Sequence, residues 1–276
     1  MANWSSTAPL TFCHLASLEV GPPDLIDMMA EAGFASTTLR MRQTAPGSPA
    51  YPLTDAAVRR ATKERIAATG VGILYTEVVA LSRSLDLQEI EALFEVSADV
   101  GITRVVTAGD DEDFSIVTEK LAQVCELARR FGMIVELEFM PFRAVKSLSD
   151  AMQVIRAADQ PNAQVMIDAL HFRRSNSSID ELKALDPKVV GSFQLCDAPA
   201  QAPSDLMYEA RNARLLTGKG GLNVDEMMDA TPADVLLAVE VPLALEFPNL
   251  SALDRAKLTV IETRKFLERR AQRPTP

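Results

Sequence analysis

The 276-residue sequence has little of what several common kinds of protein site require. Its three cysteines, Cys13, Cys125 and Cys196, are far apart and form no CxxC pair, so neither a disulfide framework nor a zinc site built on thiolates is predicted. Its two histidines exclude a metal site with three histidine ligands. No GxGxxG follows the first expected strand and no GxxxxGK-Ser/Thr motif occurs, so the usual signals of dinucleotide and P-loop nucleotide sites are missing.

Long apolar runs and positive charge are also scarce. No run approaches the roughly 18 apolar residues that suggest a membrane span, and the beginning, MANWSSTAPLTF, lacks the basic and apolar regions of a secretory signal. We therefore expect a soluble, cytoplasmic protein with no membrane partner. The formal net charge of −10 opposes non-specific attraction to phosphate backbones, so nucleic acid is not an expected partner.

Short apolar segments alternate with longer amphipathic segments along the chain. The apolar segments predict eight strands, at 10–15, 36–41, 71–78, 102–108, 133–139, 163–168, 189–196 and 234–241. Helical spacing predicts helices at 22–33, 54–69, 86–100, 113–131, 148–158 and 250–271, with C-caps at Gly33, Gly70, Gly101 and Gly132. Eight strands joined by helices favour a closed (β/α)₈ TIM barrel over an open doubly wound sheet, forming one domain over residues 1–276.

Polar residues end the last four expected strands: Glu138, Asp168, Gln194 and Glu240. Because strand ends of a barrel converge on one mouth, these side chains are expected to meet. Buried carboxylates there need a cation, a set of arginine partners, or protons. A divalent metal meets this need most simply, and the all-oxygen set suits Mn²⁺ or Mg²⁺ better than a zinc site of His and Cys. For any single residue, the alternative is a helix cap or a salt-bridge partner.

Four segments, VELEFMPF, MIDALHFRRS, FQLCDA followed by EARNARLLTGKGG, and LAVEVP, resemble the sugar phosphate isomerase/epimerase superfamily of xylose-isomerase-like TIM barrels. That group includes D-tagatose and D-psicose 3-epimerases, inosose dehydratase, 3-dehydroshikimate dehydratase and, more distantly, endonuclease IV-type DNA-repair enzymes. The resemblance is specific over about residues 133–242 and architectural over 10–132. It implies one divalent metal, with Zn²⁺ or Co²⁺ as further possibilities, bound by Glu138, Asp168, the strand-seven residue and Glu240.

The strand-seven position is the departure from the family pattern. Members usually carry His there, in an H-x-x-D arrangement, where this chain has QLCD ending at Asp197. Gln194 can still offer an oxygen, so an altered metal preference is expected, and a metal-poor variant is the alternative. Asp197 is expected to orient Gln194 or Arg211.

Further residues are expected at the mouth. His171 matches the family's D-x-x-H, whose His faces substrate oxygens; the alternative is a His that holds its loop by a backbone hydrogen bond. Arg211 matches a basic residue that resembling enzymes place over the substrate, and Arg214 competes for this role. Glu77 and His14 are also expected to point towards the mouth, with ordinary rim residues as the alternative. The loop 42–54 is a candidate lid, with a plain surface loop as the alternative. An anionic substrate could be favoured by four arginines, for which solvated surface side chains are the alternative: Arg40, Arg42, Arg173 and Arg174.

The resemblance implies that the two glutamates move protons on opposite faces of a bound keto-sugar. Removal of the α-proton of a polyhydroxy ketone or keto acid by Glu138 or Glu240 would give an enediolate. Proton return then gives epimerisation or isomerisation, and loss of a β-hydroxyl gives dehydration. An isomerase or epimerase is favoured, with a hydro-lyase as the alternative. A metal-free sugar-binding barrel and an endonuclease-like enzyme are less favoured, and a homo-oligomer is compatible with the pattern.

Overall fold

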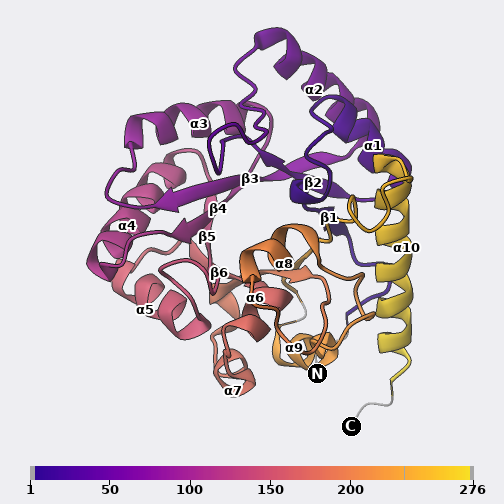
Figure 1. The fold of residues 1–276 in the computed structure, drawn as a ribbon. Coiled ribbons are helices and arrows are strands. Elements are labelled where there is room, and N and C mark those ends of the chain that lie inside the picture. Colours follow the sequence, from indigo (N-terminus) through magenta and orange to yellow (C-terminus); the bar gives the residue numbers. More distant parts are fainter. Residues whose placement is uncertain (1–3, 233, 274–276) are drawn as a thin grey trace.

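A computed structural model describes residues 4–232 and 234–273, and its centre is a closed barrel of parallel strands (Figure 1). Each strand pairs with the next along the chain, and the last pairs with the first. The strands are β1 (Leu10–Phe12), β2 (Ser36–Arg40), β3 (Gly72–Leu81), β4 (Arg104–Gly109), β5 (Ile134–Glu138), β6 (Ala163–Asp168), β7 (Val190–Leu195) and β8 (Leu236–Val239). The predicted (β/α)₈ barrel is confirmed.

The six predicted helices surround the barrel, as Figure 1 shows. They are α1 (Asp24–Ala32), α2 (Ala56–Thr69), α3 (Leu87–Asp99), α4 (Phe114–Arg130), α5 (Leu148–Ala158) and α10 (Ala252–Ala271). The four glycines predicted at helix ends all have positive φ: Gly33 (91°), Gly70 (75°), Gly101 (84°) and Gly132 (68°). Glycine adopts this left-handed conformation without the Cβ penalty of other residues, so each helix ends where the next strand can begin.

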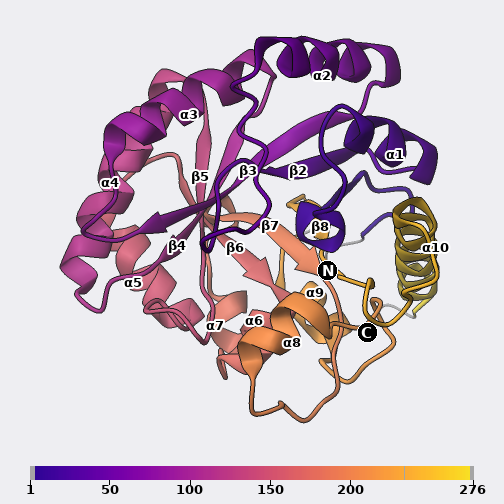
Figure 2. The ribbon, with the colours of Figure 1, turned by 45° about the horizontal axis from the view of Figure 1, so that its top comes forward.

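Four further helices and two 3₁₀ turns were not predicted. They are α6 (Ala169–Arg174), α7 (Ile179–Lys183), α8 (Leu206–Asn212), α9 (Val224–Ala230), η1 (His14–Ser17) and η2 (Pro187–Val189). Each spans two helical turns or fewer, too short for a hydrophobic period to be recognised. Helices α6 and α8 lie side by side near the ends of β6 and β7 (Figures 1 and 2), where they help to form the barrel mouth.

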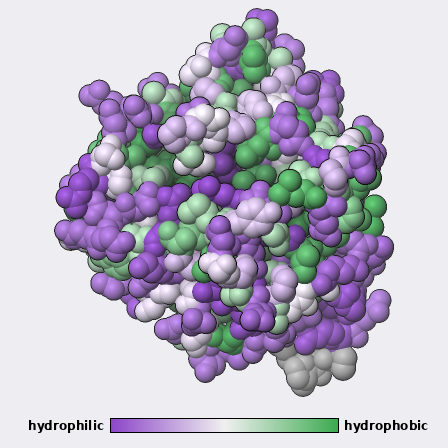
Figure 3. Space-filling model, viewed as in Figure 1, coloured by the Kyte–Doolittle hydropathy of each residue, from purple (hydrophilic) through white to green (hydrophobic). Residues whose placement is uncertain are grey.

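Apolar residues fill the space between the strands and the helices. In α4, for example, Val117, Leu121, Val124 and Ala128 follow one another at intervals of three or four residues and are all buried. Figure 3 shows hydrophobic residues scattered among hydrophilic ones on one face of the molecule. Among the described residues, no helix combines the length and the apolar composition that crossing a membrane requires.

Candidate active site

A cavity that is partly open to solvent lies at the carboxyl ends of the strands. The predicted residues that line it are Glu138, His171, Gln194, Arg211 and Glu240. Asp168 is the last residue of β6 and is fully buried. Its Oδ1 accepts a hydrogen bond from the backbone N–H of His171 at 2.9 Å. The convergence of strand ends, which the sequence analysis assumed, therefore brings the predicted side chains to one place.

The guanidinium of Arg214 lies between two of the carboxylates. Its Nη1 is 2.6 Å from Oδ2 of Asp168, and its Nη2 is 2.6 Å from Oε2 of Glu240. Its Nε donates to the carbonyl oxygen of Ala210 at 2.8 Å, and Nη1 also lies 3.4 Å from Sγ of Cys196. Only 1% of the side chain is exposed, so water screens this charge little. Arg214 thus neutralises charge that burial would otherwise make costly.

The position of Arg214 is set by the loop that carries it. Asp197, just after β7, pairs with Leu215 in an antiparallel bridge with N–O distances of 2.8 and 2.7 Å. The Asp197 carboxylate also accepts from the backbone N–H groups of Ala198 at 2.9 Å and Leu222 at 3.0 Å. Leu215, the residue next to Arg214, is therefore hydrogen-bonded to Asp197 through both its N–H and its carbonyl oxygen.

Asp197 acts differently from the prediction that it orients Gln194 or Arg211. Within the described residues, the hydrogen bonds of Asp197 all join it to the loop backbone. Because one of its partners is Leu215, the neighbour of Arg214, Asp197 positions Arg214 instead. Sequence spacing could not show this, because the bridge joins segments 18 residues apart that have no common pattern.

Gly220 allows this loop to close against β7, and its replacement gives a first prediction. A Cβ at this position would lie 2.5 Å from Oδ1 of Asp197 and closer still to the carbonyl oxygen of Ala198. We expect Gly220→Ala to lower the free energy of unfolding by about 1–3 kcal/mol, as overpacking does. Urea denaturation is the measurement, and Gly72→Ala is the matched control because its Cβ would meet nothing within 4 Å. Equal stability of the two variants would contradict this account of the loop.

Gln194 joins two carboxylates. The groups around its amide assign the nitrogen to the side that faces them, 3.2 Å from Oε1 of Glu138 and 2.9 Å from Oδ2 of Asp168. The other end of the amide lies 3.5 Å from Sγ of Cys13. With no ion between these groups, the nitrogen on this side donates hydrogen bonds to both carboxylates, whereas an ion there would be met by the amide oxygen turned to the same side.

Burial separates the pKa values of the three carboxyl groups. Burial raises the pKa of Glu138 well above its ordinary value, and the charges of Glu240 and Asp168 raise it further. Burial also raises the pKa of Glu240, to about 7, although Arg214 lowers it. For Asp168 the effect of burial is outweighed by Arg214 and His171, so its pKa is lowered. Burial therefore favours the protonated form of Glu138, Arg214 favours the charged form of Asp168, and Glu240 is close to its midpoint at neutral pH.

His171 is neutral and has a free ring nitrogen. Burial lowers its pKa to about 4. Its Nε2 lies 3.7 Å from Oε1 of Glu138, and its Nδ1 is buried with no hydrogen-bond partner within residues 4–232 and 234–273. The ring packs edge-on against Phe142, with 5.5 Å between centroids. The imidazole is thus not used to hold its loop, the alternative considered above, and can bond to a substrate oxygen.

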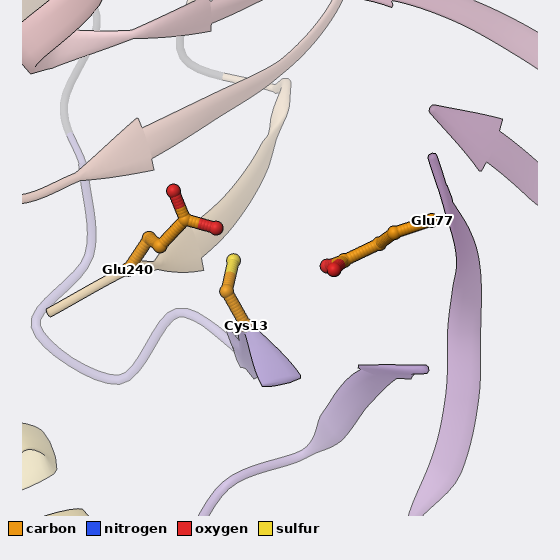
Figure 4. A group of neighbouring side chains, drawn as sticks. All are labelled: Cys13, Glu77 and Glu240. Atoms are coloured by element: carbon orange, nitrogen blue, oxygen red, sulfur yellow. The ribbon is translucent and has the colours of Figure 1, made fainter. Parts of the chain in front are cut away.

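A second cluster borders the cavity on the side of β1 and β3. Cys13, Glu77 and Glu240 point towards one another (Figure 4), with one ligand atom of each within 4.8 Å of the others. Arg40 pairs with Glu77 at 3.2 Å, and both side chains are buried. His14 is used structurally: its Nδ1 accepts from the backbone N–H of Arg40 at 3.1 Å and its Nε2 donates to a carbonyl oxygen. The Arg40–Glu77 pair was not predicted, since β3 continues past Glu77 to Leu81.

Comparison with known proteins identifies the family. Residues 26–246 match the xylose isomerase-like TIM barrel family. The chain belongs to this family. The inosose isomerase of Bacillus subtilis strain 168 is 23% identical over 154 residues, which are 52% of this chain and 54% of that protein. The chain therefore spans about half the length of this relative.

Two further relatives lie in the same group. The 3-dehydroshikimate dehydratase of Pseudomonas aeruginosa is 24% identical over 170 residues, 59% of this chain and 26% of that protein. The crystal structure of an IolI protein with a bound zinc atom superposes with a TM-score of 0.77 at 19% identity, covering 94% of this chain and 97% of that one. The curated relatives are enzymes, an isomerase and a dehydratase, and the resemblance to xylose-isomerase-like barrels is confirmed.

In this xylose isomerase-like barrel, the four arginines considered for an anionic substrate are paired with carboxylates. The pairs are Arg40–Glu77 at 3.2 Å, Arg42–Glu89 at 3.2 Å, Arg173–Glu226 at 2.5 Å and Arg174–Glu209 at 2.7 Å. Arg211 is exposed at the cavity rim, with no ion-pair partner in the described part of the chain.

Arg143, which also lines the cavity, was missed because nothing in the loop after β5 sets it apart. Thr44 brings the 42–54 loop to the cavity.

Proposed function

We propose that this protein is an isomerase or epimerase that moves a proton next to the carbonyl of a polyhydroxy ketone or hydroxy-keto acid. The observation that carries the proposal is that Glu138 and Glu240, two buried carboxyl groups with raised pKa values, line one cavity with the Arg214 guanidinium. Two carboxyl groups that favour the protonated form to different degrees can take up and return a proton. The isomerase relative supports this class of reaction.

The reaction begins with removal of the α-proton. Glu240 accepts the proton, and the enediolate oxygens accept hydrogen bonds from Arg214 and from the neutral ring of His171. Glu138 then returns a proton, at the opposite face for epimerisation or at the neighbouring carbon for isomerisation. Because the reverse reaction uses the same groups in the opposite order, either glutamate can act first. Arg211, at the rim, is assigned to the outer hydroxyl groups of the substrate.

The cation of the site has two candidates. The family resemblance implies a divalent ion, Mn²⁺ or Mg²⁺ favoured, which would polarise the substrate carbonyl and be held by Glu138, Asp168, Gln194 and Glu240. This ligand set does not fit such an ion as the chain arranges it. The ligand atoms that lie close enough together for an ion form two groups, Glu138–Asp168–His171 and Cys13–Glu77–Glu240, so Asp168 and Glu240 are in different groups. The Arg214 guanidinium lies between Asp168 and Glu240 and donates to both.

A hydro-lyase is the second candidate function, favoured by the 3-dehydroshikimate dehydratase relative. It would share the first step and then lose a β-hydroxyl from the enediolate. Incubation with inosose, 3-dehydroshikimate and a panel of ketohexoses in D₂O separates the two. Deuterium at the α-carbon without loss of water supports the isomerase or epimerase, and a dehydrated product supports the lyase. Absence of exchange with every compound would contradict both.

The pKa of Glu240 gives a pH prediction. As pH rises through about 7, Glu240 loses its proton and becomes a base, so kcat/KM for α-proton exchange is expected to rise by about tenfold per pH unit below that value. Burial and its carboxylate neighbours raise the pKa of Glu138 and favour its protonated form, the acid that returns the proton. Rates measured between about pH 5 and about pH 9 test this. A profile that is flat over this range would show that Glu240 is not the base.

A further inference from the structure

We propose that Arg214 is the permanent cation of this site, in the place that the family resemblance assigns to a divalent ion, and that the enzyme works without a metal. Its catalytic part, the stabilisation of an enediolate by the guanidinium, rests on the proposed function. Its structural part does not, because it concerns only which cation Asp168 and Glu240 bind.

The contacts of Arg214 take up one oxygen of Asp168 and one of Glu240, which an ion shared by these two carboxylates would need. Oδ2 of Asp168 and Oε2 of Glu240 each lie 2.6 Å from a guanidinium nitrogen, and Oδ1 of Asp168 accepts the backbone N–H of His171 at 2.9 Å. A divalent ion on the same oxygens would lie a few ångströms from the guanidinium, where two cations repel strongly in a buried setting. Ion binding would therefore require Arg214 to leave.

Departure of Arg214 would be costly because the side chain is built into the fold. It is among the largest fully buried side chains in the described residues, and its Nε is bonded to the carbonyl oxygen of Ala210. The next residue, Leu215, forms both hydrogen bonds of the bridge to Asp197. Arg214 is anchored at its backbone, its Nε and its guanidinium.

Gln194 is consistent with the same arrangement. A neutral imidazole in this position would offer a lone pair, which is useful to a metal ion. One end of the amide lies 3.2 Å from Oε1 of Glu138 and 2.9 Å from Oδ2 of Asp168, and with its nitrogen on that side the amide can donate to both. The replacement of His by Gln and the central arginine thus supply hydrogen-bond donors and positive charge to the same carboxylates, as a metal-free site requires.

The direct test is the metal content and metal response of the natural protein. Purified without chelator, it is expected to contain less than about a tenth of an equivalent of Mn, Zn, Co or Fe by elemental analysis. Its thermal midpoint should move by less than about 1 °C with EDTA, MnCl₂ or ZnCl₂. About one equivalent of a divalent metal, or a midpoint lowered by several degrees in EDTA, would overturn the inference.

Two variants test whether Arg214 blocks the ion. Gln194→His alone restores the family's ligand but leaves the guanidinium, so calorimetric titration with ZnCl₂ should show no binding at micromolar concentrations. Gln194→His combined with Arg214→Met should bind about one equivalent, with circular dichroism to verify the fold. Tight binding by the single variant, or no binding by a folded double variant, would contradict the inference. If the double variant does not fold, the metal content of the natural protein decides.

The α-proton exchange assay keeps this inference separate from the proposed function. Exchange that persists in EDTA supports both. Exchange that appears only after Mn²⁺ or Zn²⁺ is added overturns the metal-free inference and leaves the proposed function standing. Absence of exchange with and without metal contradicts the proposed function, while the metal content still decides which cation the site holds.

Discussion

Glu138→Gln is expected to lower the rate of α-proton exchange by about 10³-fold while leaving the fold intact. General acid–base catalysis contributes about 10²–10⁴-fold, and Gln has nearly the same shape as Glu but cannot transfer the proton. Glu138 ends β5 and lines the cavity, and burial raises its pKa, which favours the protonated form that can give up a proton. The measurement is deuterium incorporation into the best compound of the ketone panel, followed by NMR.

The stability of the same variant distinguishes a catalytic role from a structural one. The folded-state pKa of Glu138 is raised, so this carboxyl group destabilises the fold increasingly as pH rises above its unfolded value. The neutral amide removes that cost, and the variant should unfold at the same temperature as the natural protein or higher at about pH 8. Glu89→Gln, on a side chain that is 64% exposed, is the matched control and should retain full activity. Unchanged exchange in Glu138→Gln would refute its role as proton carrier.

The barrel could be predicted because its signals are local and repeated. Each strand is a short apolar run such as 163–168, and four glycines with positive φ mark helix ends before strands. The short helices α6–α9 could not be found in this way. Helix α6, for example, begins directly after β6 and is capped by the side chain of Asp168, so its start signal is the residue that the sequence analysis assigned to the metal site.

The site was predicted where residues sit at strand ends and missed where loops carry them. Strand ends must converge in a barrel, which is why Glu138, Asp168, Gln194 and Glu240 could be placed together. From the sequence alone, either Arg211 or Arg214 could serve the site. The structure buries Arg214 and leaves Arg211 exposed, because the bridge at Asp197 directs that part of the loop inward. Such a bridge depends on the three-dimensional path of the loop, which no periodicity encodes.

Arg214→Met is expected to lower the free energy of unfolding by about 3–5 kcal/mol at about pH 8. Removing one partner of a buried ion pair leaves the other charge uncompensated, and here two carboxylates lose the same partner. Methionine keeps an unbranched apolar stem, so little of the loss comes from packing. Urea denaturation followed by circular dichroism measures the change. Arg211→Met, three residues earlier on an exposed side chain, is the control and should change stability by no more than about 0.5 kcal/mol.

The pH dependence of this loss identifies its cause. In the natural protein Arg214 and His171 hold the pKa of Asp168 below its ordinary value against the effect of burial, so Asp168 contributes stability that is lost only as pH falls through that lowered pKa. Without the guanidinium, burial raises the pKa of Asp168, and the charged form becomes a cost that grows with pH. The difference between natural protein and variant should therefore widen from about pH 4 to about pH 8. A difference that is independent of pH would assign the loss to the packing of the arginine stem, and Arg214 would then not be the counter-ion of this site.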